Sequence, residues 1–143
     1  MLQEPNMTIQ IKATDLYKAV KAVKRTEYSR LPVLNHARIR LTDEGMKITT
    51  TDLEKPLTET VHFWGNGERW ETCVPMINRI KSGPYRDERI HKYYPFADSL
   101  KVAAEYRETL ELEFIEKIQL LRIKAGTSIT EFKCIDAQEF PPC

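Results

Sequence analysis

Residues 109–142, TLELEFIEKIQLLRIKAGTSITEFKCIDAQEFPP, decide the fold of this chain. Apolar and polar residues alternate through Thr109–Glu116, Ile118–Lys124 and Ser128–Cys134, which is typical of strands that bury one face. Gly126 marks the turn between the last two strands. A three-stranded meander needs a second layer over its apolar face, so the rest of the chain must supply that layer.

The first half of the sequence predicts a strand, a helix and three more strands. Met7–Ala13 alternates as a half-buried strand, and Thr14 is expected to cap a helix that runs from Asp15 to about Arg25. The strands that follow, separated by turn residues, are expected at His36–Leu41, Met46–Thr51 and Leu57–Phe63.

The second half repeats this order. Trp70–Val74 predicts a strand, Pro75 suits the first position of a helix over residues 76–82, and Gly83 stops that helix. The meander from Thr109 onward completes the repeat. We therefore expect an α+β fold of two βαβββ halves, with both helices on one side of antiparallel sheets. Residues 1–143 would form one domain, with half-repeats of about 7–63 and 70–134 and an insertion at about 84–108.

Composition is that of an ordinary globular chain, with 143 residues, 41% of them hydrophobic and 30% charged. No apolar run approaches the roughly 20 residues that a membrane-spanning helix needs, and the N-terminus does not read as a signal peptide. Cys73, Cys134 and Cys143 are widely spaced, which favours free thiols in a reducing compartment over a disulfide framework. These features predict a cytoplasmic protein.

The net charge is only +1, so any role for charge depends on its distribution. On the first predicted helix Lys18, Lys21 and Arg25 fall opposite the apolar stripe, with Lys24 at the flank. The second predicted helix offers Arg79 and Lys81. Two basic helices on one layer favour contact with a polyanion, although solvated charged faces are common on helices.

Four stretches, in register along nearly the whole chain, resemble one family. They are Leu31–Asn35 (LPVLN), Gly45–Glu54 (GMKITTTDLE), Cys73–Pro75 (CVP) and Leu120–Pro141, which ends in AQEFP. They are similar to the first domain of the bacterial DNA polymerase III beta subunit, the sliding clamp. That family builds a ring from six clamp-fold domains, with helices lining the hole and sheets pairing edge to edge outside.

The resemblance implies a non-enzymatic processivity factor that contacts duplex DNA without sequence preference. Its partners would be duplex DNA, copies of itself or other clamp domains through sheet edges, and replication proteins, with no membrane contact. On this basis the DNA-binding residues would be Lys18, Lys21, Lys24, Arg25, Arg30, Arg79 and Lys81.

The chain also departs from the family. It covers one domain where the clamp has three, and the clamp's groove for polymerase and loader peptides lies between the other two. A closed ring would need six copies of this chain or other clamp domains as partners. The insertion, residues 84–108, has no counterpart in the family and interleaves aromatic with basic residues, among them Arg86, Arg89, Tyr93 and Tyr94. Such residues could stack on unpaired bases, or they could pack on this protein or on a protein partner. Within the insertion, Ser99–Arg107 is compatible with a short helix capped by Asp98.

We find no pattern that predicts catalysis, a metal site or a cofactor. The three histidines are far apart, no CxxC pair occurs, and Asp52 in TTTDLE is expected to accept backbone N–H bonds in a turn. The leading hypothesis is therefore a clamp-like tether on DNA that acts as an oligomer. The alternative is a clamp-fold interaction or regulatory module that no longer encircles DNA. A third reading is that the chain is a fragment of a longer clamp.

Overall fold

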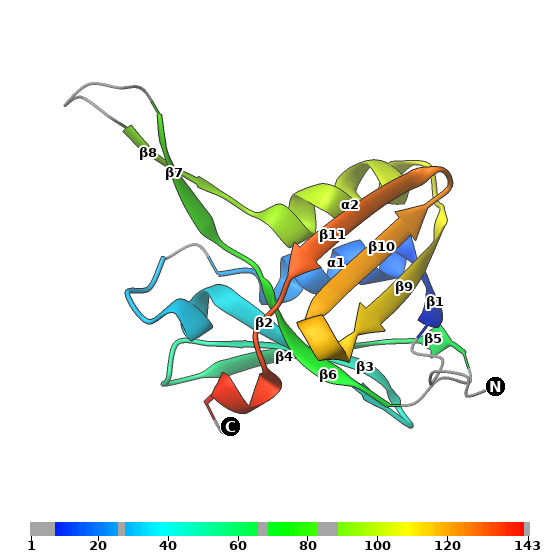
Figure 1. The fold of residues 1–143 in the computed structure, drawn as a ribbon, viewed down its shortest axis with the longest axis horizontal. Coiled ribbons are helices and arrows are strands. Elements are labelled where there is room, and N and C mark those ends of the chain that lie inside the picture. The colour runs from blue at the N-terminus through cyan, green and yellow to red at the C-terminus, as the bar shows by residue number, and fades with distance from the viewer. Residues whose placement is uncertain (1–7, 26–27, 66–68, 83–88, 142–143) are drawn as a thin grey trace.

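The computed structural model describes residues 8–25, 28–65, 69–82 and 89–141, with only the backbone for 79–82 and 89–92. Within these residues, two antiparallel sheets and a separate two-stranded ribbon accompany two helices that lie side by side (Figure 1). No helix in this part of the chain is long and apolar enough to cross a membrane.

The larger sheet has the strand order β11-β10-β9-β1-β5. Its strands are β1 (Thr8–Lys12), β5 (Phe63–Trp64), β9 (Thr109–Ile115), β10 (Leu120–Ala125) and β11 (Ser128–Lys133). The second sheet has the order β4-β3-β2-β6. Its strands are β2 (His36–Thr42), β3 (Gly45–Thr51), β4 (Pro56–Val61) and β6 (Glu71–Pro75). Short 3-10 turns lie at η1 (Pro32–Asn35), η2 (Glu116–Ile118) and η3 (Ala137–Glu139).

Each half of the chain places its first strand in the sheet of the other half. β1 pairs with β9, so that Ile9 lies opposite Leu112, and β6 pairs with β2, so that Val74 lies opposite Ala37. All four of these residues are buried. The two βαβββ halves are therefore joined through one core, and the expected α+β clamp fold is confirmed.

Two helices cover the apolar faces of the sheets. In α1 (Ala13–Val23) the residues Leu16, Val20 and Val23 are fully buried, as the helical period of the sequence predicts. In α2 (Pro95–Glu105) Phe96 and Leu100 are fully buried one turn apart. The ring of Phe96 meets that of Phe132 on β11 edge to face, with centroids 5.7 Å apart.

The position of the second helix corrects the sequence prediction. Residues 76–82 are not helical: Asn78–Ser82 form β7, which pairs with β8 (Arg89–Tyr93). The N–H groups of Met76 and Ile77 both donate to the carbonyl of Asn35, at 2.8 and 3.1 Å. The side chains of both residues are buried directly after β6. The second helix lies instead inside the predicted insertion, where α2 spans the region in which a short helix was expected from Ser99.

The first helix also differs at both ends from its prediction. It begins at Ala13, with Lys12 at the cap position and no capping side chain, so Thr14 lies inside it. It ends at Val23, because Lys24 has extended backbone angles (φ −62°, ψ 129°). Lys24 and Arg25 therefore follow the helix instead of belonging to its exposed face.

Candidate nucleic-acid interface

A groove of about 400 Å³ lies between α1 and α2 and is lined by all three lysines of the two helices. Its lining residues are Thr14, Tyr17, Lys18, Lys21, Lys101, Ala104 and Glu105. Lys18 and Lys21 are exposed on α1, and the Nζ of Lys21 lies 5.3 Å from the centroid of the Tyr17 ring. The groove combines three lysines with one carboxylate, a balance that suits loose contact with phosphates.

Lys101 is the member of this groove that the sequence reasoning missed. It was missed because the second helix was placed at 76–82. Once α2 is known, the spacing of Phe96, Leu100 and Ala103 fixes its buried face, and Lys101 falls on the exposed side. The signal was therefore present in the sequence as an 11-residue amphipathic segment.

The second helix is not basic, contrary to the sequence prediction. Within its bounds α2 carries Asp98, Lys101 and Glu105, a net charge of −1, whereas α1 carries Asp15, Lys18 and Lys21, a net charge of +1. The helix layer is positive only where Lys18, Lys21 and Lys101 come together. Cationic character is thus a property of the groove and not of both helices.

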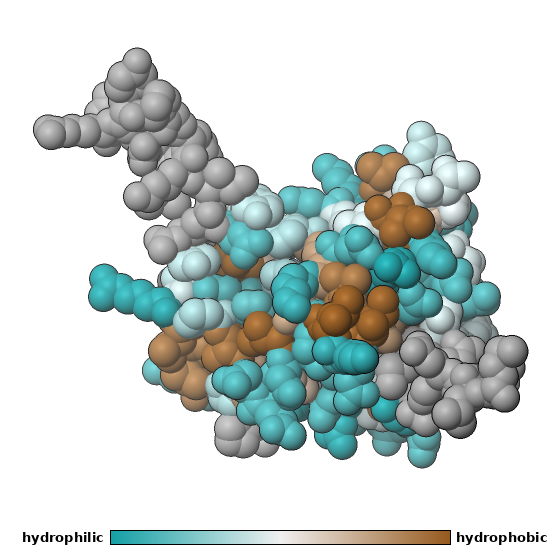
Figure 2. Space-filling model, viewed as in Figure 1, coloured by the Kyte–Doolittle hydropathy of each residue, from teal (hydrophilic) through white to brown (hydrophobic). Residues whose placement is uncertain are grey.

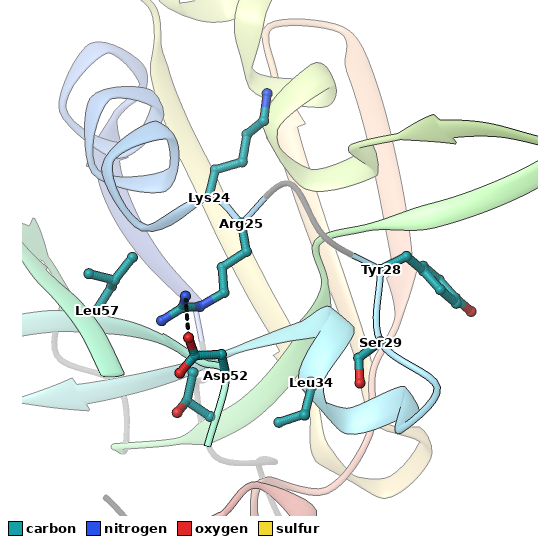
Figure 3. A pocket seen from close by; sticks show the side chains of 8 residues that line it. Lys24, Arg25, Tyr28, Ser29, Leu34, Asp52 and Leu57 are labelled. Atoms are coloured by element: carbon teal, nitrogen blue, oxygen red, sulfur yellow. Dashed lines mark hydrogen bonds and ion pairs between the residues drawn. The ribbon is translucent and has the colours of Figure 1, made fainter. Parts of the chain in front are cut away.

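Beyond the end of α1, Lys24 and Arg25 make contacts within the chain, and Figure 3 shows the one between Arg25 and Asp52. The Nζ of Lys24 lies 3.8 Å from the centroid of the Tyr94 ring, a cation–π distance. Arg25 Nη1 lies 3.3 Å from Asp52 Oδ2, and its Nη2 donates to the carbonyl of Lys55. Arg25 Nε is buried without a hydrogen-bond partner. The side chain of Arg25 is only 21% exposed, so much of its surface is turned away from a ligand in solution.

The turn that holds Arg25 is the TTTDLE segment. Asp52 Oδ1 accepts hydrogen bonds from the N–H groups of Glu54 (2.9 Å) and Lys55 (2.8 Å), as the sequence predicted for a turn aspartate. The N–H groups of Lys55 and Glu54 lower the pKa of Asp52, and the Arg25 guanidinium adds to this effect. Arg25 and Asp52 line a hollow of about 540 Å³ together with Lys24, Tyr28, Ser29, Leu34, Thr51 and Leu57 (Figure 3).

The remaining predicted DNA-binding residues lie apart from the groove. Arg30 is exposed, two residues before η1, and does not line the groove. Arg79 and Lys81 lie on β7, opposite Lys92 and Ile90 of β8, and not on a helix. The structure therefore brings Lys18 and Lys21 together with Lys101, and does not bring Arg79 or Lys81 onto the helix layer.

Tyr93 and Tyr94 of the predicted insertion contact the protein itself. The Tyr93 hydroxyl accepts a hydrogen bond from Asn78 Nδ2 at 3.1 Å, and Tyr94 is half-buried against the core in addition to its contact with Lys24. Arg89 lies on β8 opposite Ser82, and Arg86 lies outside the described residues. These contacts favour the packing alternative for Tyr93 and Tyr94.

Exposed hydrophobic side chains occur on several elements. Val102 on α2 is 61% exposed, and Tyr106, the residue that follows this helix, is 75% exposed. Figure 2 shows that hydrophobic patches on the viewed face are separated by polar side chains, with one patch over η1 and another near η2. Leu31 and Ile118, in those two regions, are also exposed.

Burial shifts the pKa values of Cys73, Cys134 and His36. No three His, Cys, Asp or Glu side chains in this part of the chain are grouped to hold a metal ion. Burial raises the pKa of the Cys73 thiol to about 12 and that of Cys134 to about 11, which disfavours the nucleophilic thiolate. Burial lowers the pKa of His36, whose Nδ1 lies 2.7 Å from the Pro32 carbonyl.

Comparisons with known proteins identify the fold. No family model and no curated protein matches the sequence. Among solved structures, the DNA polymerase sliding clamp of Caulobacter crescentus matches with a TM-score of 0.71 at 17% identity, covering 96% of this chain and 32% of that chain. The DNA polymerase III subunit beta sliding clamp of Pseudomonas aeruginosa, bound to griselimycin, matches with a TM-score of 0.70 at 22% identity, with the same coverage.

The beta subunit of the DNA polymerase of Streptococcus pyogenes matches with a TM-score of 0.70 at 13% identity, covering 95% of this chain and 32% of that chain. The chain thus spans about a third of the length of the clamps that it matches. The resemblance stated from the sequence is confirmed at the level of the fold, which is that of a sliding-clamp domain.

Proposed function

We propose that this chain is a clamp-like DNA tether that contacts duplex DNA without sequence preference and acts as an oligomer. The observation that carries the proposal is the groove between α1 and α2, where Lys18, Lys21 and Lys101 meet on the helix layer of a clamp fold. In a ring of such domains this layer would line the hole, as the resemblance implies. Loose contact between lysines and phosphates would then retain DNA without fixing its position.

The proposal revises the sequence-based set of contact residues. Lys18 and Lys21 remain and Lys101 joins them, while Lys24 and Arg25 contribute less because Tyr94, Asp52 and the Lys55 carbonyl engage them. We further propose that residues 1–143 act as one clamp-like domain in the cytoplasm, with half-repeats of about 7–63 and 70–134.

Oligomerisation would use the sheet edges. Within the described residues, β11 and β5 are the edges of the larger sheet, and β4 and β6 those of the smaller one. Cys73 on β6 is already bridged to Ile135, whose N–H and carbonyl both pair with it at 3.0 Å. β5 has only two residues, so β4 and β11 are the edges that we propose for pairing with another domain.

The test is a titration of labelled duplex DNA at two salt concentrations, with the mass in solution measured in parallel. Wild-type protein should bind, and affinity should fall steeply between about 50 and 200 mM salt. The variant K18E/K21E should bind at least tenfold more weakly, because it reverses two charges in the groove. The matched control K47E/K124E reverses two charges on the sheet strands β3 and β10 and should bind like wild type. Salt-insensitive binding, or none by any oligomeric form, would overturn the proposal.

A second function is supported by the surface of α2. The net charge of α2 is −1, and Val102 and Tyr106, which follow the groove residues Lys101 and Glu105 in the sequence, are exposed. This composition is better suited to contact with protein than with phosphate. The chain would then be a clamp-fold interaction module that does not encircle DNA. A monomer that fails to bind duplex DNA, with V102A/Y106A abolishing association with a clamp, would favour this module over the tether.

A further inference from the structure

We propose that the ribbon formed by β7 and β8 is a second DNA-contacting element, a basic arm that binds the phosphates of duplex DNA. The inference rests on the proposed DNA-tethering function and extends it to a part of the chain away from the helix layer. The ribbon pairs with neither main sheet and leaves the body of the domain as a narrow arm (Figure 1).

The pairing register places three cationic residues on one face of this ribbon. Arg79 lies opposite Lys92, and Lys81 lies opposite Ile90. Residues opposite each other across antiparallel strands share a face, as do residues two apart along a strand. Arg79, Lys81 and Lys92 therefore belong to the same face, and no acidic residue belongs to either face of β7 or β8.

This arrangement is unfavourable for the ribbon alone. Like charges directly opposite each other destabilise an antiparallel pair, and a two-stranded ribbon is marginally stable in water without other support. Among the described residues, a side-chain hydrogen bond supports the ribbon at its base, where Asn78 Nδ2 donates to the Tyr93 hydroxyl at 3.1 Å. A polyanion along this face would offset the like charges that the register places at positions 79 and 92.

Duplex DNA is the polyanion that fits both the shape and the proposed function. A two-stranded ribbon has the width that the major groove of B-DNA admits. Cations on one of its faces suit the phosphates that border this groove. Residues 79 and 81 lie about 6.6 Å apart along β7, the spacing of every second residue in a strand, and residue 92 lies across the ribbon from residue 79. The contacts would be made to the backbone and would carry no sequence preference.

The main test compares the variant R79Q/K81Q/K92Q with wild-type protein in duplex-DNA titrations over a range of salt concentrations. Loss of three phosphate contacts should flatten the slope of log K against log[salt] by roughly 2 to 3. The matched control K47Q/K117Q/K124Q removes the same charge from β3, η2 and β10 and should leave the slope as in wild type. An equal effect of both triple variants would overturn the inference.

The single variant R79E separates DNA contact from a purely structural role. It places an acidic residue opposite Lys92, so amide hydrogen exchange in the ribbon should slow while DNA affinity falls. Slower exchange with unchanged DNA affinity would overturn the inference, because the face would then matter only for the ribbon itself.

The failure of this inference is distinguishable from that of the proposed function. If K18E/K21E weakens binding and R79Q/K81Q/K92Q does not, the ribbon inference is overturned and the groove stands. If the wild-type chain binds no duplex DNA, both are overturned. If polyglutamate competes as strongly as duplex DNA of equal charge, the assignment of the ribbon to nucleic acid is overturned in favour of an acidic protein.

Discussion

The hydroxyl of Thr50, on β3, donates a 2.6 Å hydrogen bond to the carbonyl of Val23, the last residue of α1. Thr50 is 2% exposed and Val23 is fully buried. The last carbonyls of a helix have no partner within the helix, and a buried one needs a donor from elsewhere. This bond supplies that donor and fixes the end of α1 against the sheet, immediately before Lys24 and Arg25 leave the helix.

We expect Thr50→Val to lower the free energy of unfolding by about 1 to 3 kcal/mol, because it keeps the shape of the side chain and leaves the Val23 carbonyl unpaired. Urea denaturation followed by circular dichroism measures this. Thr60→Val, on the exposed part of β4, is the matched control and should change stability by less than about 0.5 kcal/mol. Equal effects of the two substitutions would show that the bond to Val23 is not significant.

The position of the second helix predicts which substitutions damage the core. Phe96→Ala should cost about 3 to 5 kcal/mol, because it removes a fully buried ring that packs against Phe132. Val102→Ala, on the exposed side of the same helix, should cost less than about 0.5 kcal/mol. Thermal unfolding of both variants checks this. A small effect at Phe96 would contradict the placement of α2 over the core.

The turn between β2 and β3 depends on Gly45. Its φ is +139°, and a Cβ atom there would lie 2.7 Å from the Val61 carbonyl oxygen of β4. We expect Gly45→Ala to cost about 1 to 3 kcal/mol through backbone strain, with a further cost from the clash. Gly126→Ala is the comparison, since φ is +60° and the nearest atom to an added Cβ lies 3.8 Å away. Its effect on the urea midpoint should be the smaller of the two.

Asp52 makes stability depend on pH in a direction that its contacts determine. Its pKa is lowered from 3.8 in the folded protein, chiefly by the N–H groups of Lys55 and Glu54. The ionised carboxylate therefore stabilises the fold above the unfolded pKa, and this contribution is lost as pH falls through the folded pKa. Asp52→Asn should lower the urea midpoint at pH 7 more than at pH 3.

The contacts of Asp52 lower its pKa by unequal amounts, and this inequality predicts a difference between two variants. Because the backbone N–H groups outweigh the Arg25 guanidinium, Arg25→Gln should retain most of the pH dependence that Asp52→Asn removes. A pH profile as flat in Arg25→Gln as in Asp52→Asn would show instead that the ion pair dominates.

Strand positions were predictable from sequence because alternation is strong where one face is buried. His36–Thr42 and Thr109–Ile115 follow the expected pattern, with Ile39, Leu110 and Leu112 all buried. The exchange of β1 and β6 between the halves was not predictable from the residues alone. It depends on which strands meet after folding, and local alternation does not encode partners.

The sequence predicted the second helix at residues 76–82. A segment of seven residues is too short for its apolar spacing to distinguish a helix from a strand. The spacing of Met76, Ile77 and Ile80 fits one face of a short amphipathic helix. It fits equally well the observed arrangement, in which Met76 and Ile77 are buried after β6 and Ile80 lies on β7. Helical spacing is sustained over 11 residues in Pro95–Glu105, of which only the part from Ser99 onward was predicted as helix from the sequence.

The candidate site was predictable only in part. Lys18 and Lys21 follow from the period of α1, but the engagement of Arg25 by Asp52 joins residues 27 positions apart. Whether a basic residue is free to bind depends on such tertiary contacts, which the charge pattern of a segment does not contain.

The crossing of β1 and β6 between the two sheets makes the halves of this molecule mutually dependent during folding. β9 begins about a hundred residues after β1, so the edge of β1 that pairs with β9 stays open until β9 has left the ribosome. Cutting the polypeptide between β5 and β6 would yield two pieces that each lack a strand which the other holds. Such fragments should be unstructured separately and reassemble when mixed, since either piece completes the sheet that its counterpart leaves unfinished.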